Sequence, residues 1–300
     1  MKFSIFQESR KGGRRANQDR IGYAYTRDSL LAVVADGMGG HLHGEVAAQI
    51  TVQYLTEAFQ RDAKGRLADP RDFLTKGILE AHYTLADYAR ARGLGESPRT
   101  TCVACVVQDS VAYCAHVGDS RLYHVRRGQV QVQTRDHSRV QVLIDRGRIR
   151  EEAVAAHPDR NKIFNCIGAV TPPEVDLSGR MALQEGDILL LCSDGLWGPL
   201  TRKLITGALL RGDVMKAAPE LLDLAEARAG KDADNLSVVA IAWEEKSADA
   251  TTVPGPDLDG VTTQREDFNK AEGSDLTEEE IEIAIAEIRA AIHKHLQPKP

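Results

Sequence analysis

The stretch from Thr100 to Thr134, TTCVACVVQDSVAYCAHVGDSRLYHVRRGQVQVQT, decides the fold class. Apolar runs rich in Val, Thr and Tyr alternate in it with short polar breaks, and these runs occupy residues 100–107, 111–117, 121–126 and 129–134. A parallel pair of strands needs a crossover of about a dozen residues or more, so breaks this short allow only antiparallel pairing. The stretch therefore predicts a meander of β-hairpins.

Further strands and helices flank the predicted meander. Apolar runs predict buried strands at 30–35, 187–193 and 236–243. Apolar spacing and helix-start signals predict helices at 44–59, 71–92 and 213–229, two short helices within 138–156 and an irregular stretch at 161–174. Strand runs interrupted by helices, with antiparallel pairing, indicate an α+β layered domain.

The composition is that of an ordinary globular protein, with 42% hydrophobic and 27% charged residues among 300. Residues 245–300 carry 13 acidic and 6 basic side chains, which leaves 31 acidic and 32 basic ones for residues 1–244. A domain this close to neutral lacks the basic surface of nucleic-acid-binding proteins, so that class is excluded. No window reaches the ~20 apolar residues of a membrane helix, and the first residues lack the apolar stretch of a signal peptide. We therefore expect a cytoplasmic protein without nucleic-acid or membrane partners.

The five cysteines agree with a reducing compartment, because an odd number in a long chain does not form a disulfide framework. Cys102 and Cys105 form a CxxC pair inside a predicted strand. Residues three apart on a strand point to opposite faces, so we interpret both as core residues rather than as a redox pair.

The end of the chain divides into a predicted linker and a predicted helix. Residues 245–274 are polar, contain Pro and Gly and show no apolar period, which is typical of a flexible linker. Over 275–297, a capping box of Thr277 and Glu280 precedes an apolar stripe at helical spacing. The stripe consists of Ile281, Ile285, Ile288, Ile292 and Leu296. Because an isolated helix this short is marginal in water, either a partner, a second copy or the chain's own domain must cover it.

Carboxylates recur where apolar strands end. Asp36 follows LLAVVA and opens DGMGG, and Asp194 follows DILLLCS and opens DGLWG. Asp19, Asp119 and Asp234 lie at further strand edges, in RRANQDR, HVGDSRLY and KDADN. A single DG step is more often a turn than a ligand. A carboxylate beside a buried strand must nevertheless be hydrogen-bonded, paired or bound to a metal, and five such positions favour a cluster.

An all-oxygen cluster without matching His or Cys suits Mg²⁺ or Mn²⁺ rather than Zn²⁺. Two such ions about 3.5–4 Å apart can activate a water and stabilise phosphoryl transfer. Gly37 lets a backbone carbonyl approach a metal with no Cβ in the way. Arg14 and Arg15 precede Asp19, and arginine binds phosphate in a bidentate manner. These residues together predict a metal site that binds a phosphate group and catalyses its transfer.

Six motifs, RRANQD, VVADGMGGH, GDSRLY, RDHS, LLLCSDGLW and DADNLSVV, resemble in this order those of the type 2C, or PPM, metal-dependent protein phosphatases of bacteria. The resemblance covers residues 1–244. It implies a four-layer α-β-β-α sandwich of two antiparallel sheets flanked by helices. It also implies hydrolysis of phosphoserine and phosphothreonine in proteins, in signalling opposite a Ser/Thr kinase.

The resemblance further implies a centre of two Mn²⁺ or Mg²⁺ ions with a third, weaker one. Asp36 would bridge two ions, with the Gly37 carbonyl on one of them. Asp194 and Asp234 would complete the other ion, and Asp119 would hold the third.

The remaining implied roles concern the substrate and the water. Arg14 would hold the phosphate and Asp19 would orient the attacking water. Eukaryotic members carry a histidine, the proposed general acid, directly after the DG step, but Met38 stands there in this chain. The acid is therefore either His41, the nearest histidine, or a metal-bound water.

Three further positions complete the expectations. His137 in RDHS and His116 in a strand run are interpreted as structural. Residues 138–174 match the variable flap beside the active site of the family, so we expect them to select the substrate. Two other functions stay open: a catalytically silent regulator that binds phosphoproteins, and a metal-dependent hydrolase of another phosphate ester.

Overall fold

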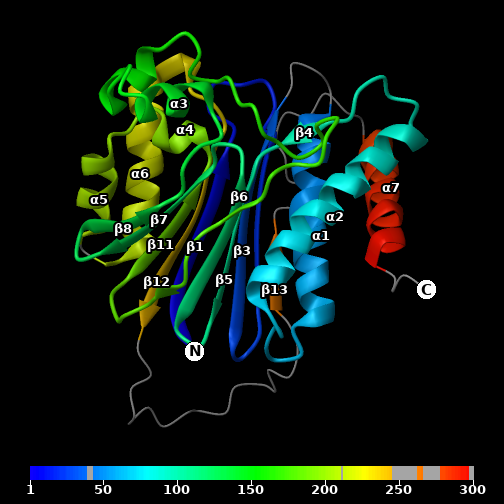
Figure 1. Ribbon diagram of the computed structural model, residues 1–300, viewed down its shortest axis with the longest axis horizontal. Coiled ribbons are helices and arrows are strands. Elements are labelled where there is room, and N and C mark those ends of the chain that lie inside the picture. Colours follow the sequence, from blue (N-terminus) through cyan, green and yellow to red (C-terminus); the bar gives the residue numbers. More distant parts are fainter. Residues whose placement is uncertain (39–42, 211, 245–261, 266–277, 297–300) are drawn as a thin grey trace.

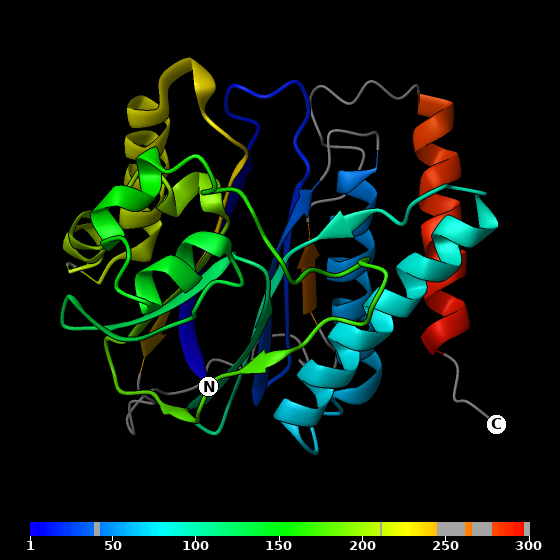
Figure 2. The same cartoon turned by 45° about the horizontal axis from the view of Figure 1, so that its top comes forward.

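The computed structural model describes residues 1–38, 43–210, 212–244, 262–265 and 278–296. Two antiparallel sheets face each other at the centre, and helices cover the outer face of each sheet (Figure 1). The turned view in Figure 2 shows the same layers. The predicted α+β sandwich is confirmed.

The first sheet has five strands in the order β1-β12-β11-β7-β8. Their bounds are Lys2–Arg10 for β1, Leu236–Glu244 for β12, Ile188–Cys192 for β11, Arg121–Arg126 for β7 and Gln129–Gln133 for β8.

The second sheet has eight strands, six of them in the order β10-β6-β5-β3-β2-β13, while β4 pairs with β3 and β9 pairs with β6. Their bounds are Met181–Ala182 for β10, Val111–Val117 for β6, Cys102–Gln108 for β5, Ser29–Met38 for β3, Asp19–Tyr25 for β2, Thr262–Arg265 for β13, Arg99–Thr100 for β4 and Asp176–Leu177 for β9.

Helices form the two outer layers (Figure 1). The eight-stranded sheet is covered by α1 (Gly44–Asp62) and α2 (Pro70–Ala91), with α7 (Glu278–Leu296) packed outside them. Asp69 caps α2, since its carboxylate accepts hydrogen bonds from two backbone N–H groups of the first turn and Pro70 follows it. Beside the five-stranded sheet lie α3 (Arg139–Asp145), α4 (Asp194–Trp197), α5 (Arg202–Leu209), α6 (Val214–Ala229) and the 3₁₀ helices Glu151–Ala156 and Gly230–Asp232.

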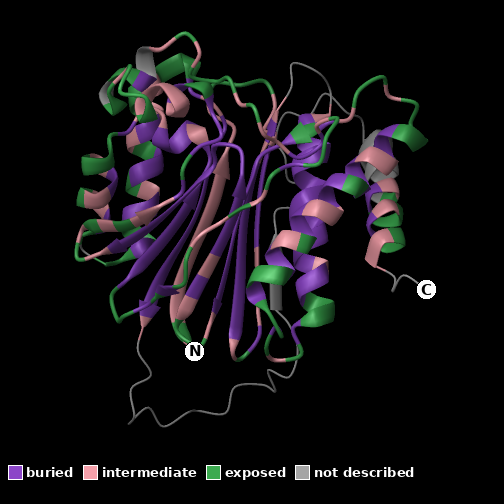
Figure 3. Ribbon diagram, viewed as in Figure 1, coloured by how far each residue is buried: buried purple, intermediate pink, exposed green. Residues whose placement is uncertain are grey.

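Side-chain alternation along the central strands builds three apolar layers. On β5, Cys102 and Val106 pack toward α1 and α2, whereas Val103 and Cys105 pack toward the facing sheet. The central strands β3, β5, β11 and β12 are almost entirely buried, whereas β1 and β8 are half-buried or exposed, and the helices bury mainly their inner sides (Figure 3). Cys102 and Cys105 are free and fully buried on opposite faces, as predicted.

The predicted meander is wrong at one connection. Within 100–134, β5 pairs with β6 and β7 pairs with β8, but β6 and β7 belong to different sheets. The three residues Gly118, Asp119 and Ser120 carry the chain from one sheet to the other, and Gly118 does so with a φ of +98°. A short connection excludes parallel pairing, but it does not force the two strands into the same sheet.

The other predicted elements of residues 1–244 are present. The strands at 30–35, 187–193 and 236–243 correspond to β3, β11 and β12. The predicted helices correspond to α1, α2, α3, α6 and the 3₁₀ helix Glu151–Ala156. The sequence analysis missed, among other elements, β1, α4, α5 and the two-residue strands β9 and β10.

The C-terminal helix lies on its own domain. In α7, Ile288 and Ile292 are 1% and 0% exposed and join the apolar cluster of α1 and α2. Lys294 and His295 contact Asp87 of α2 at 2.6 and 3.2 Å. Of the alternatives left open, the structure therefore has this domain covering Ile288, Ile292 and Leu296, while the side chains of Ile281 and Ile285 lie outside what the structure describes.

Part of the predicted linker is a strand, since β13 pairs antiparallel with β2. The rest of 245–274, together with Thr277 of the predicted capping box, lies outside the described residues. Among the helices that the structure describes, none combines the length and apolar character needed to cross a membrane.

Candidate metal centre

The five predicted aspartates lie at one end of the two sheets. Asp19 begins β2 and is the register partner of Asp36 in β3. Asp194 follows β11 and begins α4, and Asp234 lies two residues before the first residue of β12. Asp119 lies in the crossing between the sheets. Each sheet thus contributes carboxylates, which explains why positions far apart in sequence meet.

The carboxylates are close enough to perturb one another. Removal from water raises the pKa of Asp36 well above its ordinary value, and the negative charges of Asp19, Asp194, Asp119 and Asp234 raise it further. The same effects raise the pKa of Asp194 to about 7, although a hydrogen bond with Asp36 opposes the shift. Burial raises the pKa of Asp19 to about 6, against the effect of its hydrogen bond from Ser193.

Two of these carboxylates have buried oxygens without a hydrogen-bond partner among the described residues, namely Oδ1 of Asp19 and Oδ1 of Asp119. Asp19 is 0% exposed and Asp119 is 2% exposed. Burying an unpaired carboxylate oxygen is costly, and so is crowding like charges. A divalent cation relieves both costs, and an all-oxygen donor set suits Mg²⁺ or Mn²⁺. The residues present therefore fit such a site.

Gly37 lies where a side chain has no room. An ideal Cβ on it would lie 2.2 Å from the Gly44 carbonyl oxygen and 2.7 Å from that of Gln18. The backbone between β3 and α1 is thus packed tightly beside Asp36, and this packing fixes the position of the Gly37 carbonyl.

Arg14 reaches the cluster from the connection between β1 and β2. Its Nη2 lies 2.5 Å from Oδ2 of Asp234, and its side chain is 54% exposed. Asn235 holds this connection, because its Nδ2 donates to the carbonyls of Lys11 and Ala16 and its Oδ1 accepts from the backbone N–H of Gln18. An exposed guanidinium therefore stands beside the carboxylates.

The family model described as protein phosphatase 2C matches residues 8–211. The chain belongs to the protein phosphatase 2C family. A Streptococcus pyogenes protein described as protein phosphatase 2C-type is 34% identical over 228 residues, which are 74% of this chain and 91% of the relative. The serine/threonine protein phosphatase PstP of Mycobacterium tuberculosis is 35% identical over 77% of this chain. The match spans 43% of PstP, less than half of its length.

Solved structures agree with this assignment. The serine/threonine phosphatase of S. agalactiae has a TM-score of 0.72 and 32% identity, covering 81% of this chain and 100% of that one. The catalytic domain of PstP in complex with two manganese ions has a TM-score of 0.69 and 30% identity, covering 81% and 99%. The chain is thus a metal-dependent protein serine/threonine phosphatase, and the resemblance stated from its motifs is confirmed.

Several residues that support the carboxylates of this phosphatase were not found by sequence reasoning. Ser193 Oγ donates to Oδ2 of Asp19 at 2.7 Å. Thr100 and Thr101 hold the main chain of Asp36, since Thr100 Oγ1 donates to its carbonyl and Thr101 Oγ1 accepts from its N–H. Only the position of Ser193 directly before Asp194 signals such a role in the sequence.

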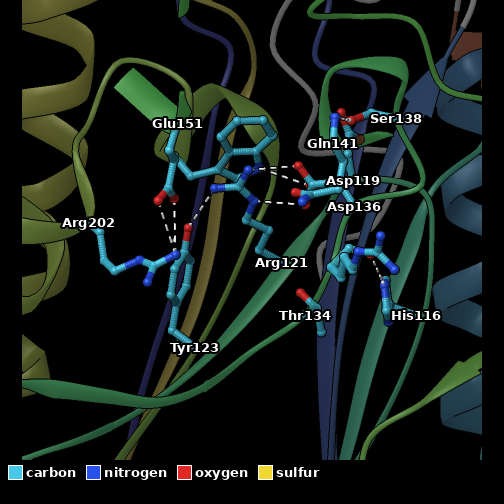
Figure 4. A network of polar contacts seen from close by, with 12 residues as sticks. His116, Asp119, Arg121, Tyr123, Thr134, Asp136, Ser138, Gln141, Glu151 and Arg202 are labelled. Carbon is cyan, nitrogen blue, oxygen red and sulfur yellow. Dashed lines mark hydrogen bonds and ion pairs between the residues drawn. The ribbon is translucent and has the colours of Figure 1, made fainter. Parts of the chain in front are cut away.

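A polar network fixes Asp119 of the phosphatase (Figure 4). The indole Nε1 of Trp197 donates to the Asp119 carbonyl at 2.9 Å. The guanidinium of Arg121 lies 3.5 Å from the centre of the Trp197 ring. Asp136 accepts two hydrogen bonds from Arg121, at 2.8 and 2.7 Å, and Tyr123 Oη accepts a third at 3.1 Å. We call Trp197, Arg121, Asp136 and Tyr123 the indole clamp.

A second cluster of metal-ligating groups, His116, His137 and Asp176, lies near the clamp. The backbone N–H of Gly118 and Nδ2 of Asn165 both donate to Nδ1 of His137, so its Nε2 carries the proton in the neutral ring. That Nε2 points to Asp176 at 3.4 Å. A protonated nitrogen is no ligand, and the contacts match the structural role expected for His137.

A groove of about 280 Å³ opens beside the carboxylates of the phosphatase. Arg14, Asp194 and Asp234 line one part of it, and Arg160 of the predicted flap lines another. His41, the predicted acid, lies outside the described residues.

Proposed function

We propose that this phosphatase hydrolyses phosphoserine and phosphothreonine in proteins at a binuclear Mn²⁺ or Mg²⁺ centre. The observation that supports this proposal best is the set of buried carboxylates, two of them with unpaired oxygens, beside an exposed arginine. We further propose that it acts in the cytoplasm against a Ser/Thr kinase. Its five cysteines are free and four of them are buried, which agrees with a reducing compartment.

In this proposal, the carboxylates of Asp36, Asp194 and Asp234 and the Gly37 carbonyl would hold the two ions. Asp119 would hold a third, weaker ion. When bound, the ions supply an activated water as nucleophile and neutralise charge on the phosphate.

Two residues of the chain act on the water and the phosphate. Ser193 occupies Oδ2 of Asp19, so Oδ1 is left to accept a hydrogen bond from water and orient it. The side chain of Arg14 is 54% exposed beside Asp234 and lines the groove, so its guanidinium can bind two oxygens of a phosphate that enters there. Arg14 thus orients the phosphate and stabilises the charge that develops on it.

Leaving-group protonation and substrate choice involve residues around the groove. We propose that the general acid is His41, the nearest histidine after Met38 in the sequence, or else a metal-bound water. Residues 138–174 are proposed to select the substrate, because Arg160 lines the same groove as Arg14.

The test is hydrolysis of p-nitrophenyl phosphate and of a phosphothreonine peptide with and without Mn²⁺. Asp36→Asn and Asp194→Asn are expected to lower kcat more than about 100-fold, because even changes outside the ligands cost about 10- to 100-fold. Asp213→Asn, at the N-terminus of α6 away from the groove, serves as the matched control. Activity that survives both substitutions and excess chelator would overturn the proposal. Faster turnover of nucleotides than of phosphopeptides would point to another phosphate ester.

A further inference from the structure

The crossing that carries Asp119 is held at each of its three residues. His137 binds both backbone groups of Gly118, accepting from its N–H at 3.1 Å and donating its own backbone N–H to its carbonyl at 2.9 Å. The hydroxyls of Ser120 and Thr101 lie 2.7 Å apart. Between them, the main chain of Asp119 depends on Trp197.

Asp119 combines a fixed backbone with one carboxylate oxygen, Oδ1, that has no hydrogen-bond partner among the described residues. Its carbonyl accepts from the Trp197 indole, while Oδ1 is buried. Nothing in the clamp thus competes for Oδ1. This is the arrangement expected of a ligand whose support lies outside the metal site.

Trp197 also links two proposed ligands directly. Asp194 begins the four-residue helix α4 and Trp197 ends it. Asp194, a proposed ligand of the two tightly bound ions, therefore begins this single turn. Trp197, which holds the proposed ligand of the weakly bound ion, ends it. The link is stiff because the indole is 7% exposed and stacks on the Arg121 guanidinium, which Asp136 fixes in two places.

We propose that Trp197 is a positioning residue, supported by Arg121, that sets the affinity of Asp119 for the most weakly bound cation. The inference rests on the proposed function, since it takes Asp119 as a ligand. It predicts that loss of the indole N–H lets the Asp119 carbonyl shift and weakens the last ion alone, while the tight ions at Asp36, Asp194 and Asp234 stay bound.

The chain contains a matched control, because it has two tryptophans. Trp197→Phe keeps an aromatic ring on Arg121 but removes the donor to Asp119. Trp243→Phe makes the same change at a ring that is 6% exposed near the other end of the five-stranded sheet. Arg121→Lys removes the flat, two-point contact with Asp136 while keeping the charge.

The experiment is a Mn²⁺ titration of the full chain by calorimetry, with kcat measured against Mn²⁺ concentration. Trp197→Phe should raise the Kd of the most weakly bound Mn²⁺ about fivefold, which is the net effect of losing one hydrogen bond. The Kd values of the more tightly bound ions should not change. Saturating Mn²⁺ should restore kcat. Arg121→Lys should weaken the same ion, and Trp243→Phe should not. In the double variant that combines Asp119→Asn with Trp197→Phe, Mn²⁺ affinity should be no lower than in Asp119→Asn alone.

Three results would overturn the inference: an unchanged last ion in Trp197→Phe, an equal weakening of all ions, or an additive loss in the double variant. If Trp197→Phe destabilises the fold itself, its Tm in the absence of metal will be lower than that of Trp243→Phe. In that case the affinity of Arg121→Lys for the most weakly bound Mn²⁺ serves as the test, and the same results support or overturn the inference. A wild-type chain that binds no Mn²⁺ would overturn the proposed function and this inference with it.

Discussion

Replacing Gly37 by alanine tests whether tight backbone packing positions the metal centre. The added Cβ would lie 2.2 Å from the Gly44 oxygen and 2.4 Å from its carbonyl carbon. Ordinary van der Waals contact begins near 3.4 Å, so α1 or the end of β3 must move by about 1 Å. Neither neighbour is a flexible side chain, and the first turns of α1 are buried. The clash can be relieved only by a backbone shift.

The size of the effect follows from that shift. Overpacking a rigid site costs about 1–3 kcal/mol, and a clash with backbone falls at the upper end, so we expect about 3 kcal/mol. Metal–ligand distances tolerate about 0.2 Å, which is several times smaller than the shift. Gly37→Ala should therefore lose Mn²⁺ binding as well as stability.

The assay combines urea unfolding with a Mn²⁺ titration. Gly179→Ala is the control, because an ideal Cβ at Gly179 has nothing within 4 Å. The reasoning fails if Gly37→Ala matches Gly179→Ala in unfolding free energy and binds Mn²⁺ with the wild-type number of ions and affinity.

Two further predictions concern stability away from the metal centre. The hydrogen bond from Lys294, aided by Arg90 and His295, lowers the pKa of Asp87 from 3.8 to about 2, so its stabilising contribution is complete above pH 4 and disappears as the pH falls through 2. The destabilisation by Asp87→Asn, measured by urea unfolding, should therefore shrink from pH 5 to pH 2, and a constant cost would contradict it. Asp187 is 0% exposed and accepts hydrogen bonds from Arg126, His124 and the Gln184 backbone. Asp187→Asn leaves the charge of Arg126 without its counter-charge and should lower the free energy of unfolding in urea by about 3 kcal/mol. A loss below about 1 kcal/mol would show that stability does not depend on this ion pair.

The sequence sufficed where local pattern decides the structure. Apolar runs located β3, β11 and β12, and the carboxylates at their ends marked the candidate site before any contact was known. The pairing of β6 with β7 was mispredicted because the break at 118–120 has the length of a hairpin loop, and only the packing of two sheets decides that it crosses between them.

The supporting contacts could not be predicted because their partners are distant in the chain. Trp197 reaches Asp119 across 78 positions, and Asn235 reaches Lys11 across 224. The apolar stripe of α7 likewise does not show what it packs against, because that depends on the surface that α1 and α2 form together. His41 and the roles of the individual carboxylates stay predictions.

Two of the connections between the two sheets, from β1 to β2 and from β6 to β7, lie at the end where the carboxylates gather. Arg14 and Asp119 lie on these crossings, while the remaining aspartates are divided between the sheets. Exchanging one sheet for that of a distant relative would therefore split the carboxylate set between two unrelated partners.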